Sequence, residues 1–213
     1  MEVIEEFKSI SPEDLWVYNK LQLSTLLRYN CGPIGMPVPE AGEYIVRPAI
    51  NFLGMGRNSR KIFLTPDDCT ESYGFPSEFW CEYFEGEHLS VDFIHGESAL
   101  VVLGKKGESI SPLDRSKTIK NTTEEHSRWR IWKKVDRKVY CPPFLKKLSN
   151  KYPVINVEFI GNRIIEVHFR KNPDFVWGNS AAIPVYYDEL IRTPPGYTFI
   201  EAPDYTRRGF YIN

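Results

Sequence analysis

Polar and apolar residues alternate most clearly in two segments, 79–93 and 154–170. In both, carboxylates or other polar residues alternate with large apolar residues, which is the period of a β-strand with one buried face. The second segment places Glu158, Glu166 and His168 near one hairpin. Two carboxylates at the end of a buried hairpin are costly to bury unless a positive group lies between them. A divalent metal that carries nucleotide phosphates would meet that requirement.

The turn of this second hairpin decides whether the two carboxylates meet. A two-residue turn at Gly161–Asn162 would pair Glu158 with Ile165 and direct Glu158 and Glu166 to opposite faces. A three-residue loop that extends to Arg163 would instead pair Glu158 directly with Glu166 on one face. A metal site here therefore requires the three-residue loop or an equivalent bulge.

The rest of the pattern predicts many strands and only two convincing helices. The strands are short and follow one another along the chain, which predicts an α+β architecture with mainly antiparallel sheets. No linker-like stretch divides the sequence, so we expect one compact domain over 1–213, with approximate lobes 40–104 and 105–213. The last 40 residues, rich in Pro, Gly and Tyr, are expected to be mostly loops. The expected helices are 11–30 and 141–153, and the expected strands lie in 42–50, 61–64, 79–104, 128–135 and 154–170.

Composition and charge narrow the class of protein. The chain has 213 residues, of which 42% are hydrophobic and 14% aromatic, as expected of a folded protein. The net charge of −1 gives no overall field for nucleic acid, but Lys105–Lys151 holds 14 Lys or Arg against 5 acids. Trp129 and Trp132 lie inside this basic segment, where they would either stack on bases or pack into the core beneath a solvated loop.

The cysteines and the N-terminus indicate the cellular compartment of the protein. Cys31, Cys69, Cys81 and Cys141 are widely spaced without a CxxC pair, so we interpret them as free thiols in a reducing compartment. The sequence begins without a signal-peptide core, and no apolar run approaches the roughly 18–20 residues that cross a bilayer. We therefore expect a soluble, cytoplasmic protein with no membrane partner.

Five segments, taken in order, resemble those of the ATP-grasp family. They cover most of the chain, from Lys20 to Arg170. The match consists of an opening helix and turn, a strand ending in a phosphate-binding basic residue and proline, a small glycine loop, a hinge strand for adenine and ribose, and a strand with metal ligands and an arginine. The matching segments are YNKLQLSTLLRYNCGPIGMPVP, EYIVRP, NFLGMGRNS, EYFEGEHLSVD and IIEVHFR.

This resemblance implies an ATP-grasp-like fold with a nucleotide cleft between two lobes. It also implies an ATP-dependent ligase that activates a carboxylate as an acylphosphate for attack by an amine, with Mg²⁺ (or Mn²⁺) bridging the phosphates. Because the match begins near the start of the sequence, part of the acceptor site is expected to come from another protein, a second subunit or an acceptor macromolecule.

The resemblance also implies roles for individual residues. Arg47, helped by Lys20, would hold a phosphate, and Arg170 would stabilise the phosphoryl group during transfer. The hinge and ribose residues would be Glu82, Tyr83, Phe84, and Glu87 or His88, and the metal ligands would be Glu158, Glu166 and His168.

Three positions depart from the family pattern. Arg47 replaces a lysine, which keeps the charge but changes the geometry. The ribose carboxylate is expected at His88, so either a bulge restores Glu87 or the histidine replaces it. His168 replaces an asparagine, which weakens the site for a hard magnesium ion or changes its metal. Two rival hypotheses are a non-catalytic nucleotide- or nucleic-acid-binding module, with Lys105–Lys151 as the nucleic-acid contact, and a plain interaction protein.

Overall fold

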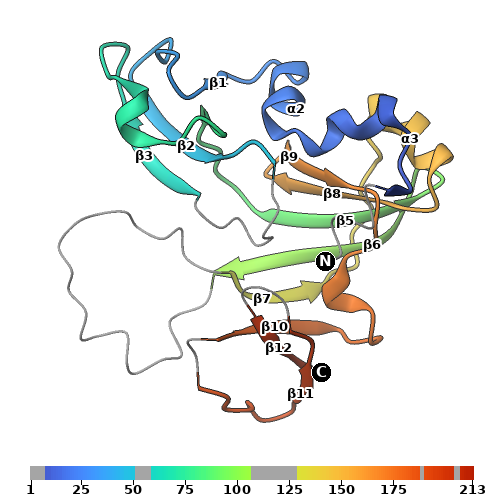
Figure 1. The fold of residues 1–213 in the computed structure, drawn as a ribbon. Coiled ribbons are helices and arrows are strands. Elements are labelled where there is room, and N and C mark those ends of the chain that lie inside the picture. Colours follow the sequence, from blue (N-terminus) through green and yellow to red (C-terminus); the bar gives the residue numbers. More distant parts are fainter. Residues whose placement is uncertain (1–7, 51–58, 107–128, 188–189, 204–206) are drawn as a thin grey trace. The chain divides into compact units, whose positions relative to one another are not determined.

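The backbone of this protein forms two compact units, shown as a ribbon in Figure 1. The first unit contains the described residues up to Gly86 together with Val157–Phe169, and the second contains the other described residues. Strand pairs in both units are antiparallel and the helices are short, which confirms the predicted α+β architecture. The single domain with lobes 40–104 and 105–213 stays a prediction. A computed structural model describes residues 8–50, 59–106, 129–187, 190–203 and 207–213.

The first unit is built on a four-stranded sheet in the order β1-β4-β2-β3. Residues alternate between the faces of β2, so Tyr44 and Val46 lie on one face while Ile45 and Arg47 lie on the other. A short 3₁₀ helix, η2 (Thr70–Tyr73), precedes β4. The strands are β1 (Cys31–Pro33), β2 (Gly42–Pro48), β3 (Arg60–Leu64) and β4 (Glu78–Glu82).

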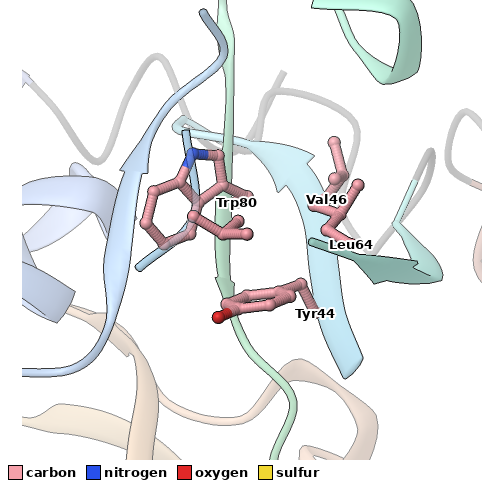
Figure 2. Packing of buried hydrophobic residues seen from close by; sticks show 5 residues of the cluster. Tyr44, Val46, Leu64 and Trp80 are labelled. Carbon is pink, nitrogen blue, oxygen red and sulfur yellow. The ribbon is translucent and has the colours of Figure 1, made fainter. Parts of the chain in front are cut away.

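One face of this sheet carries an aromatic core, seen from close by in Figure 2. Tyr44, Val46, Leu64 and Trp80 are buried there, and the rings of Tyr44 and Trp80 meet edge to face at 5.5 Å. Gly32 leaves room for the indole, because a Cβ at this position would lie 2.6 Å from the Trp80 ring. The opposite face is thereby left for the helices and for Arg47.

A hairpin of β8 (Ile155–Ile160) and β9 (Arg163–His168) adds to the first unit from Val157 onwards. Two residues, Gly161 and Asn162, connect the strands, and Gly161 has a φ of 58°. The turn packs tightly on the segment after β4, since a Cβ on Gly86 would lie 2.8 Å from the Cα of Gly161. Glycine at both positions therefore permits this close approach.

The predicted helix 11–30 is two helices, η1 (Pro12–Tyr18, a 3₁₀ helix) and α2 (Lys20–Leu26). The break is at Asn19, which has an extended backbone and accepts a hydrogen bond from the Gln22 N–H at 3.1 Å. Asn19 thus ends one helix and caps the next. Because α2 packs against β1, β4 and β9, its first residue, Lys20, lies next to the hairpin.

Six strands of the second unit follow the order β11-β12-β10-β7-β6-β5. Three strands that the sequence did not predict, β10, β11 and β12, lie within the last 40 residues, which were expected to be mostly loops. Pro184 lies inside β10, but β7 pairs with β10 only at Ala181 and Ala182, so no bond to β7 is lost. The elements are β5 (His88–Ile94), β6 (Glu97–Lys106), β7 (Trp129–Lys134), η4 (Pro143–Leu145), α3 (Lys146–Lys151), η5 (Pro173–Phe175), β10 (Ala181–Tyr186), β11 (Thr198–Glu201) and β12 (Arg207–Ile212).

Two predicted features fall outside the described residues: most of the glycine loop 51–59 and the middle of the basic segment, 107–128. The expected extended stretch around 128–135 is confirmed by β7, and the expected second helix by η4 and α3.

None of the helices in the described part of the chain has the length and apolar content needed to pass through a bilayer.

Candidate functional site

The three predicted metal ligands meet in the first unit. Glu158 comes from β8, and Glu166 and His168 come from alternate positions of β9. Their ligand atoms all lie within 4.8 Å of one another, and each residue is half-buried. The Nε2 atom of His168 lies 3.2 Å from Oε1 of Glu166. Two carboxylates and an imidazole at this spacing are a donor set that fits a divalent cation.

The hairpin reaches this arrangement with a two-residue connection, Gly161–Asn162, although the sequence predicted that it would need a longer loop or a bulge. Regular pairing across such a turn would put Glu158 and Glu166 on opposite faces, too far apart for their oxygens to lie within 4.8 Å. The pairing must therefore depart from the regular two-residue register. Burial agrees: the carboxylates are half-buried, whereas the residues on either side of each are buried, namely Val157, Phe159, Ile165 and Val167.

Lys20 stands beside these ligands. Its Nζ lies 3.2 Å from Oε1 of Glu166, and its side chain is only 5% exposed. The backbone N–H of Lys20 donates to the Ala49 carbonyl at 2.8 Å, which fixes the start of α2. Burial lowers the pKa of Lys20, and the nearby Glu166 opposes that shift only in part. The surroundings of Lys20 therefore support its charged form only in part.

Arg47 approaches the hairpin from β2. Its guanidinium lies 5.3 Å from the centre of the Phe79 ring, and Nη2 donates to the Ile165 carbonyl at 3.3 Å. The residue is buried, and among the described residues its Nε has no hydrogen-bond partner. A buried donor without a partner costs about 1–3 kcal/mol. An anionic oxygen would satisfy it.

We call Lys20, Arg47, Glu158, Glu166 and His168 the charged cluster. Burial raises the pKa of Glu166, but the positive field of Lys20, His168 and Arg47 outweighs it and holds that pKa well below the usual value. Two carboxylates thus face a lysine and an arginine, so the carboxylate and cationic side chains are equal in number. A divalent cation would add positive charge, which an anion such as phosphate would offset.

Two tyrosines that the sequence did not connect with the site support the hairpin. The Tyr18 ring lies 6.3 Å from the His168 ring and 5.6 Å from Phe169, edge-on to both. The Tyr29 hydroxyl accepts a hydrogen bond from the Ile164 N–H at 3.0 Å. Tyr18 lies in the predicted helix 11–30, but nothing in the sequence linked it to His168.

The predicted hinge residues lie at and just after the end of β4 and have contacts of their own in the first unit. Glu82 accepts a hydrogen bond from the Asn30 N–H at 3.0 Å. Tyr83 lies under the Lys61 ammonium at 4.2 Å, and Phe84 packs edge-on to Tyr29 at 4.8 Å. Roles for these residues at adenine stay predictions.

Three other predicted site residues belong to the second unit. Glu87 is exposed and pairs with Arg137 at 2.7 Å, whereas His88 is buried, with its ring edge-on to Trp132 at 5.0 Å. Arg170 is half-buried, and its Nη1 donates to the carbonyl of the next residue at 3.3 Å. The roles of Glu87 or His88 at ribose and of Arg170 at phosphate stay predictions.

Comparison with known proteins gives likenesses of structure only. No protein-family model and no curated protein matches this sequence. The ATP-grasp ligase PsnB in complex with minimal precursor, Mg and ADP is 15% identical over 79% of this chain and 55% of its own, with a TM-score of 0.46. A crystal structure of an ATP-grasp superfamily protein from Archaeoglobus fulgidus is 13% identical over 92% of this chain and 64% of its own, with a TM-score of 0.42.

This chain therefore spans just over half to just under two thirds of the length of these structures. They are ATP-grasp proteins, the family that the sequence motifs resemble. At these identities and TM-scores the likeness gives no residue of this chain a role.

Proposed function

We propose that this chain is an ATP- and metal-dependent ligase that activates a carboxylate as an acylphosphate for attack by an amine. The observation that supports the proposal most directly is the charged cluster. Two carboxylates and an imidazole offer ligand atoms within 4.8 Å of one another, beside a buried lysine and a buried arginine. A metal–triphosphate complex requires this combination, with donors for the metal and cations for the phosphate oxygens.

Within the cluster each residue would have a distinct task. Glu158, Glu166 and His168 would hold the metal, whose positive charge would stabilise the phosphates during transfer. The unpartnered Nε of Arg47 would donate to a phosphate oxygen, since a guanidinium holds phosphate in a fixed planar geometry. A phosphate nearby would support the charged form of Lys20, which burial disfavours.

The remaining predicted residues complete the proposal. Glu82, Tyr83 and Phe84 would line the adenine, with Glu87 or His88 at the ribose, and Arg170 would contact the phosphoryl group. The carboxylate would attack the terminal phosphorus of ATP and release ADP. The amine would then displace phosphate from the acylphosphate to form an amide. We expect one of the two substrates to belong to a macromolecule or to be presented by a second subunit.

Ligand-dependent thermal unfolding tests the nucleotide site. ATP with Mg²⁺ or Mn²⁺ should raise the unfolding temperature, because a ligand at one hundred times its Kd stabilises the folded state by about 2.7 kcal/mol. Glu166→Gln keeps the size of the side chain but removes the negative charge, so it should abolish the metal-dependent part of the shift. The matched control is Glu43→Gln, an exposed carboxylate of the same unit that pairs with Lys61 at 2.6 Å. Full metal-dependent stabilisation of Glu166→Gln would remove the site assignment.

Product analysis tests the reaction itself. ADP release that requires both a carboxylate and an amine supports the ligase. Nucleotide binding without such release would favour the non-catalytic module instead. Binding to oligonucleotides that weakens steeply with salt and ignores ATP would favour the nucleic-acid reading of the basic segment.

A further inference from the structure

The donor set of the charged cluster contains a nitrogen. His168 contributes an imidazole whose Nε2 lies 3.2 Å from Oε1 of Glu166, and its ligand atom lies within 4.8 Å of those of both carboxylates. The side chain is 14% exposed. Since Tyr18 lies edge-on to the imidazole, the ring is held beside the carboxylates rather than projecting into water.

Ligand type separates the metals that suit such a site. Magnesium is a hard cation that prefers carboxylate, carbonyl and water oxygens in near-octahedral geometry. Imidazole nitrogen suits first-row transition metals, whose affinities for mixed nitrogen and oxygen sites rise from Mn²⁺ through Co²⁺. Two carboxylates with one imidazole therefore favour a transition metal over magnesium to a greater degree than an all-oxygen set would.

We propose that His168 is a metal ligand that makes this site select a first-row transition-metal dication over Mg²⁺. The inference deepens the proposed function and rests on it, because it names the class of metal that accompanies the nucleotide. The equal number of carboxylate and cationic side chains in the cluster adds a condition. Lys20 lies 3.2 Å from Glu166 and Arg47 donates to the same hairpin, so two positive side chains stand beside the two carboxylates and the metal binds tightly only together with an anion such as ADP.

Metal affinities measured calorimetrically in the presence of ADP test the proposal. The wild type, His168→Asn and His168→Gln are each titrated with Mg²⁺ and with Co²⁺. An amide replaces the nitrogen ligand with an oxygen, so the ratio of Co²⁺ to Mg²⁺ affinity should fall by at least about tenfold in both variants. The matched control is His95→Asn, an exposed histidine in a turn at a φ of 50°, which asparagine tolerates. Its affinity ratio should equal that of the wild type.

The visible spectrum of bound Co²⁺ gives a second readout that needs no variant. A nitrogen ligand should shift the absorption of the wild-type Co²⁺–ADP complex away from that of Co²⁺ with oxygen ligands alone. An all-oxygen spectrum, or an affinity ratio that is the same in the wild type and in His168→Asn, would overturn the role of His168. In that case metal-dependent ADP binding would persist and the proposed function would stand. Wild-type protein that binds neither metal with ADP would remove both.

Discussion

Each unit of this protein buries a group of polar side chains, and the two groups are held in different ways. In the first unit the charged cluster consists of ionisable groups that face one another. In the second unit the group is an amide network of Ser90, Asp92, Asn156 and Asn172. Asn156 Nδ2 donates to Ser90 Oγ at 2.9 Å and to Asp92 Oδ1 at 2.8 Å. The Asn172 side chain and backbone donate to the same two residues.

The difference separates a structural group from a binding group. In the amide network one carboxylate, that of Asp92, receives hydrogen bonds from neutral donors, so its bonds are made within the protein. In the charged cluster Arg47 keeps a buried Nε without a partner among the described residues, and burial disfavours the charged form of Lys20. We therefore expect substitutions near the amide network to change stability, and substitutions in the charged cluster to change binding.

The largest loss of stability is expected from Arg207→Met. Arg207 Nη1 pairs with Asp174 at 3.1 Å, both side chains are almost buried, and the Asp174 N–H donates to Asn172 of the amide network. Removing the guanidinium takes away the positive charge that faces the buried Asp174 carboxylate, so urea unfolding should show a loss of about 3 kcal/mol. The control is Arg137→Met, which breaks an exposed pair and should cost less than about 1 kcal/mol. Equal losses in the two variants would contradict a structural role for the buried pair.

A smaller, pH-dependent change is expected from Asp92→Asn. Burial raises the pKa of Asp92, and its hydrogen bonds with Asn156 and Asn172 oppose that shift only in part. The folded state therefore binds this proton more tightly than the unfolded state, so ionisation destabilises the fold as the pH rises through the raised pKa. The asparagine variant does not ionise and so does not lose this stability. Relative to the wild type, its free energy of unfolding should increase as the pH rises above the usual pKa of aspartate and should then level off, as measured by urea unfolding at several pH values. A constant difference across that range would show that Asp92 does not titrate as its burial requires.

The strand pattern of the sequence grouped the predicted metal ligands, whereas Lys20 and Arg47 were assigned to the same site only through the resemblance to the ATP-grasp family. Glu166 and His168 lie two residues apart on a strand, so the period of two already placed them on one face. The contact of Lys20 with Glu166 joins residues far apart in the sequence, and it depends on the packing of α2 against β9. No local pattern carries that information. The length of the turn left the register at Glu158 open, since a two-residue and a three-residue loop around Gly161–Asn162 both fit the sequence.

The amide network was missed for a related reason. Asn156 sits in the run VINVEF, where a single amide between apolar residues could as well face solvent. Asn156 can be buried because its side chain donates to Ser90 on β5, to which Asn172 also donates. Ser90 and Asn172 belong to other parts of the chain, so the local sequence did not show these partners. The three final strands were missed because proline and glycine indicate turns, although Pro184 is tolerated where β7 no longer pairs with β10.

A smaller change in stability than that of Arg207→Met, and the sharpest contrast with it, is expected from Lys20→Met. Burial already disfavours the charge of Lys20, and Glu166 keeps Arg47 and His168 as neighbours, so unfolding should shift by only about 1 kcal/mol. Loss of one positive charge leaves the cluster negative. Co²⁺ without nucleotide should then bind more tightly than to the wild type, because less charge repels it, while ADP with the metal should bind less tightly. Calorimetric titration with Co²⁺ alone, and with ADP in the presence of Co²⁺, measures these two affinities, which should change in opposite directions. If both affinities fell together, Lys20 would be supporting the fold of the hairpin rather than balancing the charge of a metal–phosphate site.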